Sequence, residues 1–176
     1  MKKLIVIHAT KSPDDYKLSP EDIVEMNSQE RFQDPMPYHY IVNTDGTILK
    51  GRADREVCGH CGRWSVNSLS VAYAGGLSAE SGEETDTLSE TQEKGLRTVL
   101  NNLLKRHPEA EVVGANELLH PDEARENYEP FFDVRKWFYC QRDKGVSTGE
   151  NGRNNVDSQN WILPTPCPLP KEGNTV

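Results

Sequence analysis

Five histidines and four cysteines are the residues of this chain whose side chains best suit catalysis or metal binding. A neutral imidazole is a general base and a zinc ligand near pH 7, whereas a cysteine acts as its thiolate. Three histidines, His8, His39 and His60, follow a strand or lie in a loop, where they can face a shared cleft. His107 ends a predicted helix, where a positive charge suits the helix dipole, and is interpreted as structural.

The segment Cys58-Gly59-His60-Cys61 has the C-x-x-C spacing of thiol–disulfide oxidoreductases. Their mechanism places the first thiol at a helix N-terminus, which lowers its pKa, but residues 62–65 are predicted to form a loop. A structural zinc site would need a second ligand pair, and Cys140 and Cys167 lie far apart. Two reduced thiols are the favoured interpretation, with the redox and zinc interpretations left open.

Length and charge narrow the class of protein. The 176 residues suit one domain, and 28 acidic against 20 basic residues give a net charge of −8. This balance argues against nucleic-acid and anionic-membrane partners, and no apolar run is long enough to span a bilayer. The apolar run before His8 is too short for a signal peptide, so we expect a cytoplasmic protein as synthesised, with release by lysis.

The elements that must position these histidines are short strands. Residues 4–7 form a β-branched run typical of a strand that is covered on both faces. Residues 38–50 are predicted to form a hairpin around Asp45-Gly46, because glycine supplies the positive φ of the turn. Further strands are predicted over 69–74 and 111–113.

Three helices are predicted between and after these strands. The first covers 20–32 with Ser19 as N-cap, and the second covers 90–107 with a capping box at Ser89 and an apolar stripe. A short third helix is expected over 131–139.

The composition changes near the C-terminus. Gly, Ser, Asn and Pro dominate residues 144–176, which predicts a domain over 1–143 and an extended or disordered tail over 144–176. Residues 80–86 form an acidic loop. A protein partner could bind through this loop or the tail.

Taken together and in order, these segments resemble the N-acetylmuramoyl-L-alanine amidases, the family of the amidase-type phage lysozymes and the peptidoglycan recognition proteins. The resemblance implies an α/β fold with a central mixed β-sheet of about five strands flanked by helices, and a groove at the end of the strand that carries His8. The matching segments are Ile5–Thr10, Tyr38–Arg52, Gly59–Cys61, Asn67–Gly76, Leu88–His107 and Pro130–Val134.

The family's chemistry requires zinc held by two histidines and a Cys or Asp, with one position open for the water that attacks the amide. The resemblance implies that His8 is the first zinc ligand. Tyr38 would be the catalytic tyrosine of an active enzyme, which steadies the oxyanion. Ala115 occupies the second ligand position and Glu129 the third, and His120 is a possible replacement ligand.

The resemblance also implies a wall of substrate-binding residues, namely Tyr38, His39, His60, Trp64 and Asn67. Because the methyl group of Ala115 has no donor atom, we expect zinc to be absent or weakly bound. The preferred interpretation is a protein that binds peptidoglycan or muramyl peptides, with catalysis impaired or lost. The alternatives are a divergent active zinc amidase, like a phage lysozyme, that cleaves the bond between muramic acid and L-alanine, and a regulatory protein-binding module.

Overall fold

The computed structural model describes residues 2–29, 36–59, 62–118 and 130–140. Four of the predicted features lie outside these ranges: the end of the first helix near residue 32, His60, the segment with His120 and Glu129, and the tail over 144–176. Within the described ranges, no helix combines the length and the apolar character that a membrane span requires.

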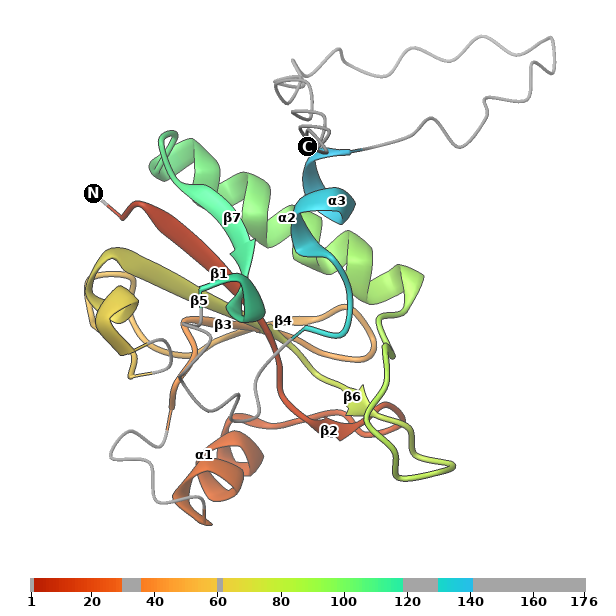
Figure 1. Ribbon diagram of the computed structural model, residues 1–176. Helices are drawn as coiled ribbons and strands as arrows, with labels where there is room; N and C mark the ends of the chain where they lie inside the picture. The colour runs from red at the N-terminus through yellow and green to blue at the C-terminus, as the bar shows by residue number, and fades with distance from the viewer. Residues whose placement is uncertain (1, 30–35, 60–61, 119–129, 141–176) are drawn as a thin grey trace, which may run out of the picture.

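The centre of the molecule is a five-stranded sheet in the order β4-β3-β5-β1-β7 (Figure 1). Strand β1 runs parallel to both of its neighbours, β5 and β7, and only β4 is antiparallel, to β3. This arrangement confirms the predicted mixed sheet of about five strands. The strands are β1 (Leu4–Ala9), β3 (Tyr40–Val42), β4 (Ile48–Lys50), β5 (Ser68–Tyr73) and β7 (Glu111–Gly114).

A second sheet joins β2 (Ser12–Pro13) to β6 (Gly76–Leu77) beyond the end of β1. It was not predicted, because a two-residue strand leaves no periodic pattern in the sequence.

The helices are α1 (Pro20–Gln29), α2 (Glu90–Arg106) and α3 (Val134–Tyr139). The capping box of α2 is formed as predicted, since Ser89 accepts from the backbone N–H of Gln92. Helix α3 begins three residues later than predicted, because the Asp133 side chain caps it by accepting from the backbone N–H of Lys136.

Two short 3₁₀ helices, η1 (Gly62–Asn67) and η2 (Ala115–Glu117), complete the described structure. The predicted loop over 62–65 is therefore wrong. Local hydrogen bonds of a single 3₁₀ turn carry little sequence signal.

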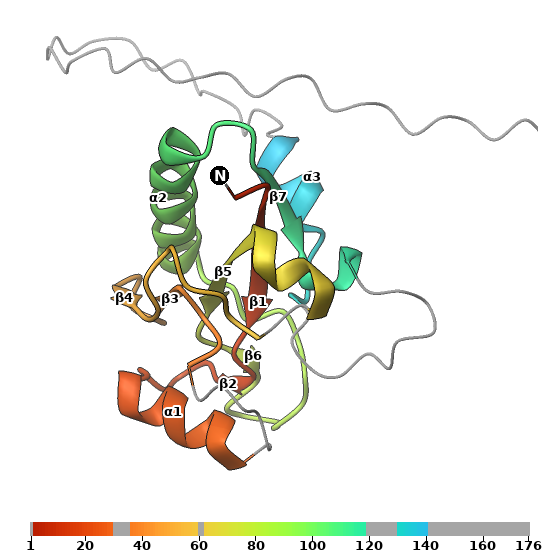
Figure 2. The same cartoon turned by 90° about the vertical axis from the view of Figure 1, so that its left-hand side faces the viewer.

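Helices α2 and α3 cover one face of the sheet, where Leu96 and Leu100 of α2 and Val134 of α3 pack into the main apolar core. Helix α1 lies beyond the end of β1, as Figure 2 shows, and its Ile23 joins a second cluster with Ile41 and Ala72. Side chains alternate along each strand, so successive residues of β1 serve different environments. The C-terminal end of β1 is the end of the sheet where the resemblance places the groove.

Candidate functional site

His8 is the next-to-last residue of β1 and pairs in register with Ala72 of β5. Its neighbours Ile7 and Ala9 pack in the core beneath α2, so the side chain of His8 faces the opposite side of the sheet. The imidazole is fully buried, and its ring centroid lies 5.8 Å from that of Tyr38. The structure thus brings together the residues predicted as first zinc ligand and catalytic tyrosine.

Ala115, predicted from the resemblance to occupy the second ligand position, directly follows β7. The parallel register of β1 and β7 ends with Ile7 opposite Gly114, and the next residue, Ala115, begins η2. The methyl group of Ala115 is buried and packs with Val6 and Val113 in a small apolar cluster. A side chain without a donor atom therefore follows the last paired residue of β7.

The turn that carries Ala115 is firmly held. The backbone N–H of Gly114 donates to Oε1 of Glu117 at 2.8 Å, and the other oxygen of Glu117 pairs with the guanidinium of Arg135 on α3. Sequence analysis missed this role of Glu117 and Arg135, because nothing in their spacing shows that α3 returns to the end of β7.

The described residues do not fit a zinc ion. They contain no group of three His, Cys, Asp or Glu side chains arranged to hold a metal. His8 offers one imidazole, and Ala115 offers a methyl group. Glu129 and His120, the other predicted ligands, lie outside the described residues, so their role as metal ligands stays a prediction.

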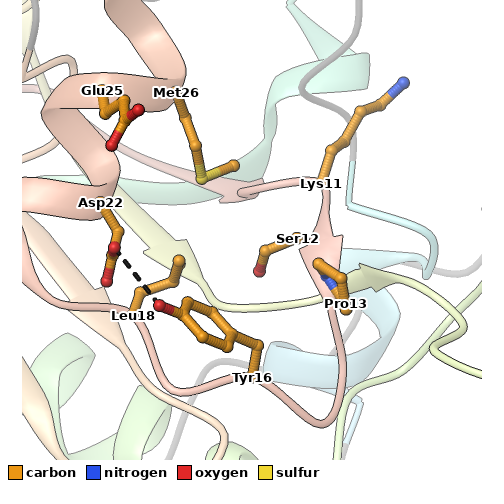
Figure 3. A pocket seen from close by; sticks show the side chains of 8 residues that line it. All are labelled: Lys11, Ser12, Pro13, Tyr16, Leu18, Asp22, Glu25 and Met26. Atoms are coloured by element: carbon orange, nitrogen blue, oxygen red, sulfur yellow. Dashed lines mark hydrogen bonds between the residues drawn. The ribbon is translucent and has the colours of Figure 1, made fainter.

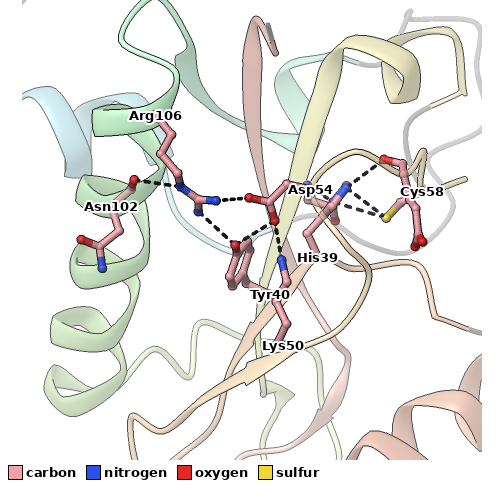
Figure 4. Close-up of polar contacts among 9 residues, drawn as sticks. His39, Tyr40, Lys50, Asp54, Cys58, Asn102 and Arg106 are labelled. Carbon is pink, nitrogen blue, oxygen red and sulfur yellow. Dashed lines mark hydrogen bonds and ion pairs between the residues drawn. The ribbon is translucent and has the colours of Figure 1, made fainter.

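His39 lies inside the protein and makes its polar contacts with the chain itself (Figure 4). Its Nδ1 accepts from the backbone N–H of Ser70 at 3.0 Å, which leaves Nε2 to donate to the carbonyl of Glu56 at 3.2 Å. These contacts assign the neutral tautomer with the proton on Nε2. Burial lowers the pKa of His39, in agreement with a neutral ring.

Cys58 is the other partner of His39. Its Sγ lies 3.3 Å from Nδ1 of His39, and the thiol is fully buried and outside any disulfide. A buried thiol in such surroundings behaves as a packing group rather than a redox nucleophile. The second cysteine of the motif, Cys61, lies outside the described residues.

Trp64 and Asn67 both belong to η1 but reach different places. The indole N–H of Trp64 donates to the carbonyl of Leu118 at 3.2 Å, so its half-exposed ring lies beside the turn that carries Ala115. Asn67 comes just before β5 and accepts from the backbone N–H of Lys3 at 2.8 Å, at the start of β1. Five residues separate Asn67 from Ala72, roughly 16 Å along a strand, so the structure does not bring Asn67 to His8.

The hairpin that carries Tyr38 and His39 is tied to α2 by a polar network that the sequence analysis also missed (Figure 4). The carboxylate of Asp54 accepts from the hydroxyl of Tyr40 at 2.8 Å and pairs with Lys50 and Arg106. Burial alone would raise the pKa of Asp54, but these hydrogen bonds and ion pairs lower it. The network fixes the outer strands of the sheet against the C-terminal end of α2.

Comparison with known proteins agrees with this geometry. Residues 2–130 match the family model described as N-acetylmuramoyl-L-alanine amidase. The chain belongs to this amidase family. The match includes His8, Tyr38 and Ala115, three of the predicted site residues.

Phage endolysins are among the relatives of this amidase-family chain. It is 25% identical over 134 residues to the endolysin of Escherichia phage T7, covering 76% of this chain and 83% of that protein. It is 26% identical over 144 residues to the endolysin of Enterobacteria phage K11, covering 82% of this chain and 85% of that protein.

Solved structures show the same fold. The Ph2119 endolysin of a Thermus scotoductus bacteriophage superposes with a TM-score of 0.56 at 27% identity, covering 68% of this chain and 74% of that chain. Drosophila PGRP-LB superposes with a TM-score of 0.59 at 13% identity, covering 83% and 86% of the two chains. At 13% identity, the second likeness concerns the fold alone.

Proposed function

We propose that this amidase-family protein binds muramyl-peptide fragments of peptidoglycan beside His8 and Tyr38, and that it does not hydrolyse them. The observation that carries the second part is the placement of Ala115. Ala115 directly follows Gly114, the last residue of β7 in register with β1, and by the resemblance it stands where a zinc histidine is expected, which supports this part of the proposal.

Family membership and structural relatives support the ligand class. The similar structures include a Drosophila peptidoglycan recognition protein SD, with a TM-score of 0.52 at 16% identity, covering 66% of this chain and 70% of that chain. They also include a Drosophila PGRP-LB mutant in complex with tracheal cytotoxin, with a TM-score of 0.54 at 13% identity, covering 69% and 73%. Tracheal cytotoxin is the ligand of that PGRP-LB mutant. That this chain binds a related ligand is part of the proposal.

The proposal gives each of the described site residues a role in binding. The hydroxyl of Tyr38 would hydrogen-bond the sugar–peptide junction, and the buried ring of His8 would pack behind Tyr38. Trp64, half-exposed beside the turn with Ala115, would offer an apolar surface to the lactyl and alanyl groups. His39 would act as a positioning residue, because its ring holds the hairpin against Ser70 and Glu56.

Binding is tested by isothermal titration of the full chain with muramyl dipeptide. Tyr38→Phe should weaken binding about fivefold, the effect of losing one ligand hydrogen bond. Tyr40→Phe is the matched control, since Tyr40 lies two residues away and its hydroxyl contacts Asp54 and Arg106 instead. Equal affinities for wild type and Tyr38→Phe would remove Tyr38 from the site, and no binding by wild type would overturn the proposal.

Hydrolysis is tested separately by mass spectrometry of muramyl peptide incubated with the protein, once with added zinc and once with chelator. We expect no released peptide under either condition. Release that disappears with chelator would show an active zinc amidase with ligands from residues 119–129, the segment of His120 and Glu129. His120→Ala and Glu129→Ala would then identify them.

A further inference from the structure

The ring of His39 replaces a backbone acceptor at the start of β3. In the parallel register of β3 and β5, the backbone N–H of Ala74 donates to the carbonyl of Val42 at 2.8 Å. The same pattern, continued toward the start of both strands, would bring the N–H of Ser70 to the carbonyl of Tyr38. That N–H donates instead to Nδ1 of His39 at 3.0 Å. One ring nitrogen thus completes the pairing of the two strands next to Tyr38.

Tyr38 itself lies just outside the regular strand, which begins at Tyr40. Its carbonyl accepts from the backbone N–H of Arg52 at 3.0 Å, and a Cβ at Gly51 would lie 2.2 Å from the same oxygen. Its ring packs against that of His8. Because the ladder with β5 does not include Tyr38, the position of Tyr38 depends on the histidine that follows it.

Only the neutral form of His39 can make this set of contacts. Nε2 carries the ring proton and donates to the carbonyl of Glu56 at 3.2 Å, so an added proton goes to Nδ1. Nδ1–H would then point at the N–H of Ser70, and two donors do not form a hydrogen bond. The ring is fully buried, so bulk water does not separate the two groups. Protonation therefore has to move the ring.

A buried acceptor lies on the same residue that loses its bond. The hydroxyl of Ser70 is buried and has no hydrogen-bond partner among the residues that the structure describes. Such an unsatisfied hydroxyl costs free energy while the ring is neutral. Ser70 and His39 share the face of the sheet where Ile41 and Ala72 pack, so the hydroxyl is on the side of the ring. After a rotation of the ring, a protonated Nδ1 can donate to this oxygen.

The thiol of Cys58 limits how the ring can rotate (Figure 4). Its Sγ lies 3.3 Å from Nδ1 and 3.6 Å from Nε2 of His39, and Cys58 is fully buried. In a closely packed interior, a ring does not turn without displacing its neighbours. The displacement should reach Tyr38, which is joined to His39 by one peptide bond.

The groups around the ring favour the neutral form at pH 7. Burial lowers the pKa of His39 most, and the bond to the carbonyl of Glu56 raises it. The ammonium groups of Lys2 and Lys50 lower this pKa further, whereas the carboxylate of Asp54 raises it. Asp54 is itself paired with Lys50, which offsets its charge. The protonated form should therefore appear only below the ordinary histidine value of 6.5.

We propose that His39 is an acid-sensitive positioning residue, which holds Tyr38 in place as the neutral ring and displaces it when the protonated ring turns from the N–H to the hydroxyl of Ser70. Binding of muramyl peptide is then weaker in acid, while the chain stays folded. This inference rests on the proposed function, because Tyr38 is the residue to which that function gives the ligand hydrogen bond.

The first test is titration calorimetry of the full chain with muramyl dipeptide between pH 7.5 and pH 5. The dissociation constant should rise by up to about tenfold per pH unit below the midpoint, the limit for one proton. His39→Asn keeps an acceptor near the place of Nδ1 and does not titrate, so its affinity should vary far less. Titration of the ligand itself is common to both proteins. An equal pH dependence of the two proteins would overturn the inference.

The second test removes the acceptor for the protonated ring. In Ser70→Ala, the midpoint should move to lower pH by about one unit, the effect of one hydrogen bond to a charged group. Ser68→Ala is the matched control, because Ser68 is equally buried on the same face of β5 and its hydroxyl donates to the carbonyl of Ser65 at 3.5 Å. An unchanged midpoint in Ser70→Ala would overturn the inference.

A third measurement needs no ligand. With ¹³C-labelled tyrosine and histidine, the ring resonances of Tyr38 should shift with the same midpoint as those of His39. Tyr16 is the reference, because its hydroxyl donates to Asp22 in a pocket beside α1 whose lining does not include His39 (Figure 3). No coupled shift of Tyr38, or global unfolding at this midpoint, would overturn the inference even if muramyl dipeptide binds. A coupled shift without dipeptide binding would support the displacement of Tyr38 and overturn the proposed function.

Discussion

The two faces of the central sheet are both buried, but they carry different chemistry. Toward α2 and α3, the two central strands contribute large apolar groups, namely Ile5, Ile7, Leu69, Val71 and Tyr73. From the same strands, the other face receives smaller or polar groups, namely Val6, His8, Ser68, Ser70 and Ala72. The difference lies in residue type and not in exposure.

This comparison separates stability from recognition. A face filled with large aliphatic groups supplies most of the free energy of folding, since that energy scales with the apolar area buried. The other face can exchange a side chain such as that at position 115 while the strand pairing of β1 and β7 is preserved. Substitutions on the two faces should therefore have different consequences, and the predictions below test this from the largest effect to the smallest.

Leu100→Ala removes a fully buried side chain of α2 from the main core. The cavity and the lost burial should lower the free energy of unfolding by about 2–5 kcal/mol, measured by urea denaturation. Muramyl-peptide affinity of the folded fraction should not change. A loss under 1 kcal/mol would show that this face is not the principal source of stability.

Ala115→His places an imidazole beside His8 in a closely packed cluster. Overpacking should cost about 1–3 kcal/mol of unfolding free energy, and zinc affinity measured by equilibrium dialysis should rise. In the double variant with His8→Ala, the gain in zinc affinity should disappear. A single variant that binds no more zinc than wild type would show that position 115 is not the missing ligand position.

Ser89→Ala removes the N-cap of α2, whose hydroxyl accepts from the backbone N–H of Gln92 at 3.2 Å. The expected loss is about 1 kcal/mol of unfolding free energy, without an effect on ligand affinity. Ser81→Ala, a serine in the exposed loop before α2, is the control and should have a smaller effect. A change in affinity with the Ser89 variant would mean that the two faces are coupled.

The free energy of unfolding should vary least with pH near pH 7. Its variation in acid should come from the face of the sheet opposite α2 and α3. Burial lowers the pKa of His39 below its ordinary value of 6.5, so the unfolded chain binds more protons in acid. Stability should therefore fall as the pH drops below about 6.5, and protonation would also end the bond that Nδ1 accepts from Ser70.

His39→Asn should flatten this dependence, measured by denaturation between pH 7 and pH 5. His107→Asn is the comparison variant, because burial also lowers the pKa of His107, so that this substitution measures the second contribution in the same direction. Identical slopes for wild type and His39→Asn would show that His39 is not the group responsible.

The elements that could be predicted from the sequence are those whose formation depends on residues close together in the chain. The capping box at Ser89 and the Asp45-Gly46 turn both appear in the structure as expected, because each depends on residues within one turn. The sequence could not show that Asp133 begins α3, since Phe131 and Phe132 have the apolar character of a helix but pack against the core before it.

The candidate site divides in the same way. The resemblance grouped His8 with Tyr38, and the structure brings their rings to a centroid distance of 5.8 Å, whereas the role of Ala115 stays a prediction. Asn67 was grouped with them because its segment resembles a family motif. The direction of β5, which carries the chain from Asn67 toward Ala72, separates it from His8, and strand direction is a property of the whole fold.

The central position of β1 also bears on how the chain folds as it is made. Its two partner strands, β5 and β7, begin at Ser68 and Glu111. Both edges of β1 therefore stay unpaired until these later segments are synthesised. Until then, its apolar residues Leu4–Ile7 are an unpaired edge of the kind that favours aggregation. A nascent chain that has not yet reached Gly114 cannot complete the sheet, which gives early chaperone contact with β1 a physical reason.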